Sequence, residues 1–360
     1  MSHKSAIKEI QNRVSEAYEK HNGLHIIGGG SKSFYGNDLH LDEIEVLDLE
    51  GNGLEGIIQY EPGELVIQVG AGTRLVDVIE RLDQNDQMLA FEAPVFNGEA
   101  TLGGMVASGI SGSRRPYTGA VRDYLLGVDI VDGQGQHLSF GGQVMKNVAG
   151  YDVSRLLVGS MGCLGVITEV SLKVLPKPKC ESTKGLEVSK VQALEIMNSL
   201  QTHYPTVSAS AYFEGRLYVR FSGMENSVMK AARKFGGEKI DNKLWEEIDN
   251  LECFKEDHAL WRLSIAPDSK LFLNDAALID WAGGQRWLID PDMNPREVLS
   301  ASGESGHLIL VRRKNKDKSD SPFHLPFHPL NPILLNLHRG LKKQFDPRDI
   351  LNPHKMYEDF

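Results

Sequence analysis

The sequence has 360 residues, 41% of them hydrophobic and 24% charged, which is enough for a buried core and suggests two domains. Its net charge of −10 at pH 7 argues against a nucleic-acid partner, because such a partner requires a basic face to neutralise phosphates. Three cysteines, Cys163, Cys180 and Cys253, have no C-x-x-C spacing, so we expect neither a metal site nor a disulfide framework.

The chain opens with the pattern of an amphipathic helix, with Ile7, Ile10 and Val14 on one side. This stretch lacks the apolar core of a signal peptide, and no segment approaches the roughly 20 apolar residues that span a bilayer. We therefore expect a cytoplasmic protein that reaches the inner face of the cytoplasmic membrane only through a partner.

A glycine-rich loop follows the first predicted strand. The strand Leu24–Ile27 leads directly into Gly28-Gly29-Gly30-Ser31-Lys32. Consecutive glycine amides can form a concavity that binds an anion, and the serine and lysine add a hydroxyl and a positive charge. The spacing matches neither the Rossmann G-x-G-x-x-G nor the P-loop. Taken alone, a triple glycine is more often a flexible turn, so its weight depends on the other glycine clusters.

Short strands and one helix come next. We expect a strand at Ile44–Leu49 and a hairpin of Gly56–Tyr60 with Leu65–Val69, turned by a Pro-Gly pair. Thr73 is predicted to cap a helix that continues to about Gln84.

The region from Ala100 to Val170 carries two further glycine clusters. The first places four glycines among alanines and serines, and the second, Gly159–Gly165, comes directly before an apolar strand. Few side chains project from such segments, so a ligand can approach the backbone and accept hydrogen bonds from its amides. A hairpin of Leu125–Val131 and His137–Phe140 lies between them. Together the clusters predict a large anionic ligand that lies along backbone amides.

Beyond a proline-rich exit at Pro176–Pro178 the pattern changes. Helical stretches alternate with short strands, as in a small α+β domain; they are helices at 188–203, 226–235 and 241–254 and strands at 207–213, 216–221, 259–265 and 306–311. Prolines forbid regular structure across 321–331, and a last helix is predicted at Ile333–Gln344.

Four motifs in this order resemble a known family. They are the loop at Gly28–Lys32, the segment Tyr60–Leu75, the segment Ala100–Asp123 and the segment Lys146–Val170. Together they resemble the FAD-binding domain of the vanillyl-alcohol oxidase/p-cresol methylhydroxylase (PCMH) superfamily. The motif KNVAGYD, with the short C-terminal region and the closing FDPRDILNPHKM, is similar to the FAD-binding subunits of bacterial glycolate oxidase.

The resemblance implies an α+β fold with a PCMH-type FAD-binding domain of two subdomains at 1–178 and a smaller cap or substrate domain at 179–330. Residues 331–360 would form a helix and a closing segment that returns to the flavin domain. The implied FAD-contacting residues are Gly28, Gly29, Gly30, Ser31, Lys32, Pro94, Thr101, Gly103, Gly104, Ala107, Ser108, Gly109, Ser111, Gly112, Gly162, Gly165, Val166, Ile167 and Asn352. Non-covalent binding is expected, because Ser31 and the small residues Ala107–Gly112 stand where relatives tether flavin through His or Cys.

The catalytic residues are unknown from the sequence. Oxidation of a 2-hydroxy acid needs a base for the hydroxyl proton and a cation for the carboxylate. Candidates for the cation are Arg114 and Arg115, which follow the glycines; a phosphate or surface contact is the alternative. Candidates for the base are His307, His324 and His328, for which a surface-loop role is the alternative.

Three hypotheses of function follow. The favoured one is an FAD-binding subunit of a heteromeric glycolate oxidase, which oxidises glycolate to glyoxylate with a sister catalytic flavoprotein and an iron–sulfur subunit. The second is a self-sufficient FAD-dependent 2-hydroxy-acid dehydrogenase or a sugar oxidase. The third is a non-catalytic flavin-binding assembly subunit. The sequence lacks the H-x-G-D-G-N-x-H run of larger dehydrogenases of the superfamily, which argues against the second hypothesis.

Overall fold

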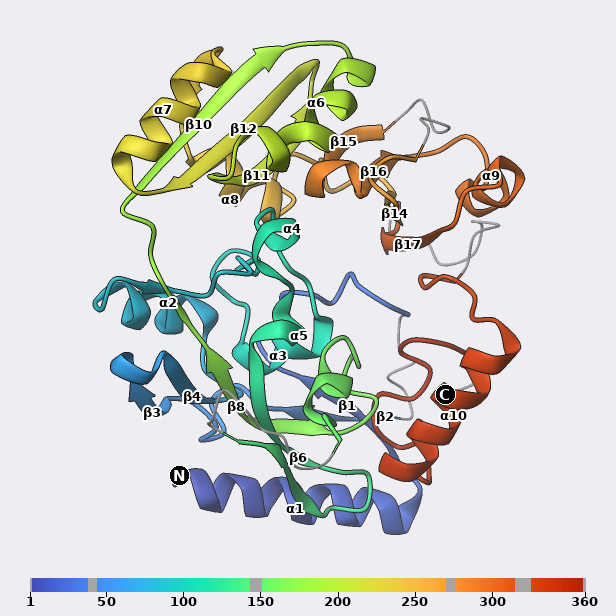
Figure 1. Ribbon diagram of the computed structural model, residues 1–360. Helices are drawn as coiled ribbons and strands as arrows, with labels where there is room; N and C mark the ends of the chain where they lie inside the picture. The colour runs from blue at the N-terminus through green and yellow to red at the C-terminus, as the bar shows by residue number, and fades with distance from the viewer. Residues whose placement is uncertain (1, 38–43, 143–150, 270–275, 315–324, 359–360) are drawn as a thin grey trace. The chain divides into compact units, whose positions relative to one another are not determined.

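The computed structural model describes residues 2–37, 44–142, 151–269, 276–314 and 325–358 (Figure 1). The motif KNVAGYD starts at Lys146 and lies mostly outside these residues, as does His324. The chain forms two compact units, which we describe one at a time. The first unit comprises Met1–Ile110, Ala120–Pro176 and Pro329–Phe360, and the second comprises Ser111–Gly119 and Lys177–His328.

The first unit is built on an antiparallel five-stranded sheet. Its strand order is β3 (Ile57–Glu61), β4 (Val66–Gly70), β8 (Val166–Lys173), β6 (Leu125–Val131) and β7 (His137–Gly141). The two predicted hairpins, β3–β4 and β6–β7, are confirmed. Two minor pairs complete the unit: β1 (Gly23–Ile27) runs parallel to β2 (Ile44–Asp48), and β5 (Gln87–Met88) pairs with β9 (Leu175–Pro176).

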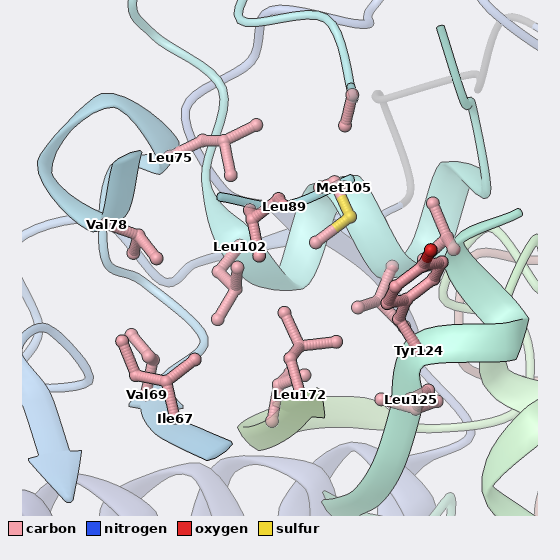
Figure 2. Packing of buried hydrophobic residues seen from close by; sticks show 14 of the residues in the cluster. Ile67, Val69, Leu75, Val78, Leu89, Leu102, Met105, Tyr124, Leu125 and Leu172 are labelled. Atoms are coloured by element: carbon pink, nitrogen blue, oxygen red, sulfur yellow. The ribbon is translucent and has the colours of Figure 1, made fainter. Parts of the chain in front are cut away.

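Two helices pack against this sheet through a shared core. Figure 2 shows side chains of α2 (Leu75–Asp83) and α3 (Leu102–Ser108) meeting those of the strands; the labelled residues include Leu75, Val78, Leu102, Met105, Ile67, Val69, Leu125 and Leu172. The predicted cap of α2 was wrong by one residue. The N-cap is Arg74, while the Thr73 hydroxyl donates to the Gly70 carbonyl at 2.7 Å and accepts from Gly56 N–H. The short α5 (Val121–Tyr124) packs in the same core.

A second core lies under the N-terminal helix α1 (His3–Lys20). The predicted apolar face is confirmed, because Ile7, Ile10 and Val14 are all buried there. They pack in one cluster with Leu24 of β1 and Leu351 near the chain's end. The backbone N–H of Leu24 donates to the Ile350 carbonyl at 2.6 Å, and residues 24 and 351 form a parallel bridge. The closing segment thus returns to the first unit, as the resemblance implied.

The second unit contains one antiparallel sheet of eight strands. The order is β13 (Glu238–Ile240), β10 (Cys180–Glu187), β12 (Arg216–Gly223), β11 (Val207–Phe213), β15 (Ala276–Asp280), β16 (Gln285–Ile289), β14 (Leu260–Ile265) and β17 (Gly306–Arg312). Its largest apolar cluster includes side chains of α6 (Lys190–His203), α7 (Glu225–Phe235) and α9 (Pro295–Ser302). Trp245 of α8 (Lys243–Asp249) bonds to Thr183 of β10. The short helix α4 (Arg115–Thr118) contacts β11.

The expected α+β class is confirmed by these two sheets and the helices beside them. The last helix, α10 (Pro332–Phe345), agrees with its predicted bounds to within one residue. Among the helices that the structure describes, none is both long enough and apolar enough to cross a membrane.

Candidate cofactor site

A pocket in the first unit lies between the glycine loop after β1 and the helix α3. Its volume is about 160 Å³, which is smaller than the roughly 300–1,000 Å³ of a site that encloses a whole drug-sized ligand. The pocket is therefore large enough for only part of a dinucleotide. It is lined by His25, Ile26, Ile27, Gly28, Gly29, Gly30, Ser31, Lys32, Ser33, Thr101, Gly104, Ala107, Ser108, Met161, Asn352 and Lys355.

Close packing explains why the loop must be glycine. A Cβ at Gly29 would lie 1.7 Å from the Glu99 carbonyl oxygen, and one at Gly28 would lie 2.4 Å from the Thr101 hydroxyl. A side chain at Gly29 would require the backbone to move, and one at Gly28 would have to displace the Thr101 hydroxyl. Gly30 has open space around it, but its φ of +62° is a conformation that side chains disfavour. The loop is thus fixed against residues 99–101, and its polar groups face the pocket.

The opposite wall is the first turn of α3. Thr101 is its N-cap, and the hydroxyl accepts a hydrogen bond from the Gly104 N–H at 3.3 Å. A Cβ on Gly104 would stand 3.1 Å from that hydroxyl and 3.9 Å from the Lys32 ammonium. Glycine at position 104 therefore keeps the space between the helix and the lysine open.

Lys32 is one of two lysines that line this pocket, and the other is Lys355. The Nζ of Lys32 donates to the Ser31 hydroxyl at 3.1 Å and lies 5.4 Å from the centre of the Phe96 ring. Burial lowers the pKa of the Lys32 ammonium to about 8. A buried ammonium beside a hydroxyl and glycine amides is suited to an anion, which would remove the cost of burying the charge.

Asn352 closes the pocket from the far end of the sequence. Its side-chain oxygen accepts from the Ile26 N–H at 2.8 Å, and its side-chain nitrogen donates to the Met161 carbonyl at 2.7 Å. A Cβ on Gly162, whose φ is +77°, would lie 2.6 Å from that nitrogen. The amide thus holds the glycine loop and the second glycine cluster together.

Six residues of the lining are not among the predicted cofactor residues: His25, Ile26, Ile27, Ser33, Met161 and Lys355. His25 lies on the strand before the loop, and its Nδ1 is buried without a hydrogen-bond partner among the described residues. Burial and the neighbouring Lys355 charge lower the pKa of His25. Lys355 donates to the Asn37 carbonyl at 2.9 Å. Met161 and Lys355 are distant from the loop in the sequence, and the fold brings them beside it.

Several predicted cofactor residues are not in the pocket lining. Gly103 packs on Ala71, where a Cβ would come within 2.9 Å of the alanine Cβ, and Gly165 packs on Ile130 in the same way at 2.7 Å. The remaining predicted cofactor residues of the first unit that do not line the pocket are Pro94, Gly109, Gly162, Val166 and Ile167. Ser111 and Gly112 belong to the second unit, where the Gly112 carbonyl accepts from the Trp281 ring nitrogen at 3.0 Å.

The candidate catalytic arginines both have partners in the second unit. Arg114 is 5% exposed and forms an ion pair with Glu181. Burial would raise the pKa of Glu181, but the charges of Arg220 and Arg114 hold it below its usual value. The Arg115 guanidinium lies 4.2 Å from the centre of the Trp281 ring. Both arginines thus have structural contacts that would have to break, or be shared, for a substrate.

Two of the three candidate histidines form a pair. The rings of His307 and His328 are 5.1 Å apart, and His328 Nδ1 accepts from the Leu308 N–H at 3.3 Å. Burial, with the charges of His307 and Arg296, lowers the pKa of His328. Within the residues that the structure describes, no three His, Cys, Asp or Glu side chains form a group that could hold a metal ion.

Comparisons with known proteins identify the family of the chain. Residues 5–141 match the FAD binding domain family. The chain is 39% identical over 350 residues, 96% of either chain, to glycolate oxidase subunit GlcE of Escherichia coli (strain K12). It is 33% identical to glycolate oxidase subunit GlcD of Bacillus subtilis (strain 168) over 127 residues, 35% of this chain and 27% of that one.

The fold of p-cresol methylhydroxylase with substrate bound is similar, with a TM-score of 0.69 and 16% identity, over 98% of this chain and 88% of that one. An alkyldihydroxyacetonephosphate synthase structure gives a TM-score of 0.67 at 16% identity, over 97% and 75%. The chain therefore belongs to the glycolate oxidase subunit family of FAD-binding oxidoreductases, and its fold is similar to that of p-cresol methylhydroxylase.

Proposed function

We propose that the chain is the FAD-carrying subunit of a heteromeric glycolate oxidase, which converts the 2-hydroxy acid glycolate to glyoxylate. Electrons would pass from flavin to an iron–sulfur subunit, with a sister flavoprotein as the catalytic partner. The near full-length similarity to a glycolate oxidase subunit supports this proposal. The single structural observation that carries it is the Lys32 pocket between two glycine-lined walls.

The pocket residues fit the diphosphate of FAD. The groups that face it are a lysine, a serine hydroxyl and the glycine loop, which suit an anion, and Cβ atoms on the glycines would clash or narrow the space. The bound cofactor would supply the acceptor for the two electrons that leave the hydroxy acid. Lys32 would balance the diphosphate charge, and Asn352 would hold the two glycine segments at a fixed distance.

We propose that the binding is non-covalent. Among the pocket residues none is a cysteine; Cys163 is buried near Asn352, and burial raises the pKa of its thiol to about 11. Such a thiol is a poor nucleophile for a flavin. The only histidine of the lining is His25. Acid precipitation should release all the flavin into the supernatant, whereas a yellow pellet would contradict this part of the proposal.

Catalysis in this chain alone is less well supported. Arg114 is paired with Glu181, and Arg115 covers Trp281, so neither guanidinium is dedicated to a substrate carboxylate. This favours turnover that needs the sister subunit. The similarity to the D-lactate dehydrogenase of Anaerostipes hadrus, 35% identical over 34% of this chain, keeps the self-sufficient dehydrogenase as a second candidate.

Stopped-flow mixing separates the candidates. We expect the isolated, FAD-loaded chain to keep its flavin absorbance when mixed with glycolate or D-lactate under anaerobic conditions. With the sister flavoprotein and iron–sulfur subunit added, glycolate should reduce an artificial acceptor. Rapid bleaching of the isolated chain by either acid would instead support the self-sufficient enzyme. If the complex is equally active with an FAD-free variant of this chain, then the chain is a non-catalytic assembly subunit.

The same partners determine where the protein resides. We propose a cytoplasmic location, with contact to the inner face of the membrane made only by other subunits. Fractionation of cells with and without those subunits tests this: the chain should move from the membrane to the supernatant when they are deleted.

A further inference from the structure

We propose that Lys32 is a covalent modification site for small aldehyde acids, above all glyoxylate, in the chain that has not yet bound FAD. The product would be an imine between the lysine nitrogen and the aldehyde carbon. The inference rests on the proposed function only for the source of the aldehyde, since glyoxylate is the product of the proposed oxidation. Because the modified lysine stands where the diphosphate would bind, the reaction would block loading of the cofactor.

The amine of Lys32 has no carboxylate partner in the part of the chain that the structure describes. Its Nζ donates to the Ser31 hydroxyl at 3.1 Å, and the centre of the Phe96 ring lies 5.4 Å away. A buried ammonium without a counter-charge is costly, which favours the neutral amine, and burial lowers the pKa of Lys32 to about 8. At about pH 7.5, roughly a quarter of these amines are neutral, against roughly one in a thousand for an exposed lysine.

The pocket gives a small aldehyde access to this amine. Lys32 is half-buried and lines the cavity of about 160 Å³. A Cβ on Gly104 would lie 3.9 Å from Nζ, so the glycine leaves room beside the nitrogen. A two-carbon acid is much smaller than a drug-sized ligand, and a cavity of this size is sufficient for it.

Backbone amides beside the lysine are suited to the carboxylate of the aldehyde acid. The N–H groups of Gly29, Gly30 and Ser31 donate to no acceptor among the described residues, and all three residues line the pocket. Consecutive amides of this kind form a concavity that binds an anion. We therefore expect an aldehyde with a carboxylate to bind beside Nζ before it reacts, whereas a neutral aldehyde lacks this contact.

The reaction is an addition followed by the loss of water. The neutral Nζ attacks the aldehyde carbon, and the electron pair of the C=O bond moves to oxygen. One proton passes from nitrogen to this oxygen, and the Ser31 hydroxyl, 3.1 Å from Nζ, is placed to relay it. The carbinolamine then loses its hydroxyl and the second nitrogen-bound hydrogen as water, which leaves the imine. No oxidant or reductant is consumed.

Lys355, the other lysine of the lining, is a poorer target. It is only 9% exposed, and its Nζ donates to the Asn37 carbonyl at 2.9 Å. This contact directs the nitrogen toward the backbone of residue 37, so an attack on an aldehyde would require the hydrogen bond to break. The same pocket should therefore distinguish its two amines.

Reductive trapping tests the inference on the full-length chain. The chain, prepared without FAD, would be incubated at about pH 7.5 with glyoxylate and cyanoborohydride, and its carboxymethylated lysines mapped by peptide mass spectrometry. We expect Lys32 to be labelled at least about tenfold faster than Lys355 and than Lys8, an exposed lysine of α1. Bound FAD should protect Lys32 alone. Acetaldehyde, which has no carboxylate, should lose most of the preference for Lys32 over Lys8. Labelled chains should no longer quench flavin fluorescence.

Equal labelling rates at Lys32 and Lys8 would overturn the inference, and so would equal labelling of Lys32 with and without FAD. An undiminished preference with acetaldehyde would show that the amides do not hold a carboxylate, which also contradicts it. In the Lys32→Arg chain the fast-labelled site should vanish while Lys8 reacts as before. The wild-type comparison needs no substitution, so misfolding of a variant cannot obscure it. It also needs no turnover: a complex that fails to oxidise glycolate would count against the proposed function alone.

Discussion

Lys342 and Asp346 form an ion pair with 2.8 Å between Nζ and Oδ2, in which the side chains are only 4% and 0% exposed. The lysine also donates to the carbonyls of Cys163 and Leu351, and the aspartate accepts from the N–H groups of Ile350 and Leu351. One buried polar centre thus joins α10, the second glycine cluster and the closing segment.

Removing the lysine alone should destabilise the first unit strongly. In Lys342→Met the Asp346 carboxylate stays buried without its partner, which costs about 3–5 kcal/mol. Denaturant unfolding measures the loss, and Lys343→Met, an exposed neighbour, should stay within about 0.5 kcal/mol of wild type. Equal stability of the two variants would contradict a structural role for the pair.

The pH dependence of this pair has a defined sign. Burial alone would lower the pKa of Lys342, but Asp346 and its neighbours raise it above the usual value. Because the pKa of this lysine is raised in the folded state, its charge stabilises that state fully at pH values below the unfolded pKa of about 10.4. The stabilisation is lost as the pH rises through the folded pKa. The pair should therefore contribute its full stabilisation at neutral pH.

Lys32 should set the affinity for FAD. Replacing it with methionine removes a charge-assisted contact to the diphosphate, worth about 1.5–3 kcal/mol, or roughly a 10- to 150-fold weaker Kd. Quenching of flavin fluorescence in a titration measures the Kd, with Lys8→Met on the exposed side of α1 as the control. An unchanged Kd in Lys32→Met would remove the lysine from the site.

The affinity should also depend on pH through the same residue. Because burial holds the pKa of Lys32 near 8 before an anion binds, binding of the diphosphate must take up a proton above that pH. The wild-type Kd for FAD should therefore increase as the pH rises from 8 to 10. The Lys32→Met chain should have a flatter profile, and parallel profiles would show that another group titrates.

A methyl group in the glycine loop should empty the pocket without unfolding the chain. Gly29→Ala places a Cβ 1.7 Å from the Glu99 carbonyl oxygen, so the loop must move. Gly63→Ala, in the β3–β4 turn, meets no atom within 4 Å and is the matched control. FAD content per chain after desalting should fall below a tenth in the first variant and stay normal in the second. Full FAD content in Gly29→Ala would mean that the loop is not the binding wall.

Because of Asp280, the free energy of unfolding of the second unit should fall as the pH rises. Burial raises the pKa of Asp280 to about 7, although hydrogen bonds from Gln285 and Trp287 act in the opposite direction. Its Oδ1 and the Gln285 Oε1 are buried acceptors without partners among the described residues, so a proton on the carboxyl supplies a needed donor.

A carboxyl whose folded pKa is raised stabilises fully below the unfolded pKa of about 3.9, and this stabilisation is lost as pH rises toward 7. The free energy of unfolding should therefore decline over that range. Asp280→Asn, which keeps a donor, should flatten the decline and match or exceed wild-type stability at pH 8. Asp268→Asn, at an exposed position, should leave the profile unchanged. A steep decline that persists in Asp280→Asn would point to another group.

Much of this arrangement was predictable from local patterns. The glycine clusters predicted the loop and the first turn of α3. Close packing against the backbone requires glycine at these positions regardless of residues far away in the sequence. The strands β10, β15 and β16 were not predicted. β10 reads Cys-Glu-Ser-Thr-Lys-Gly-Leu-Glu, which has no apolar alternation. Its polar side chains include Glu181, which accepts a hydrogen bond from Ser222 on the neighbouring strand.

The contacts that a sequence cannot reveal are those between distant residues. Arg114 meets Glu181 across 67 positions, and no local signal distinguishes this buried arginine from Arg115 beside it. Lys355 lines the pocket because the β-bridge between residues 24 and 351 brings the closing segment beside β1. In both cases the sheet topology determines which side chains meet, and the residues nearby in the sequence do not.

The hydrogen bond from the Ile26 N–H to Asn352 has a consequence for biosynthesis. The two residues are 326 positions apart, so the ribosome makes the glycine loop roughly 15–65 s before the residue that closes the pocket, at about 5–20 residues per second. A nascent chain therefore lacks a complete pocket through most of its synthesis. We therefore expect FAD to bind in this pocket only when the chain is almost fully translated.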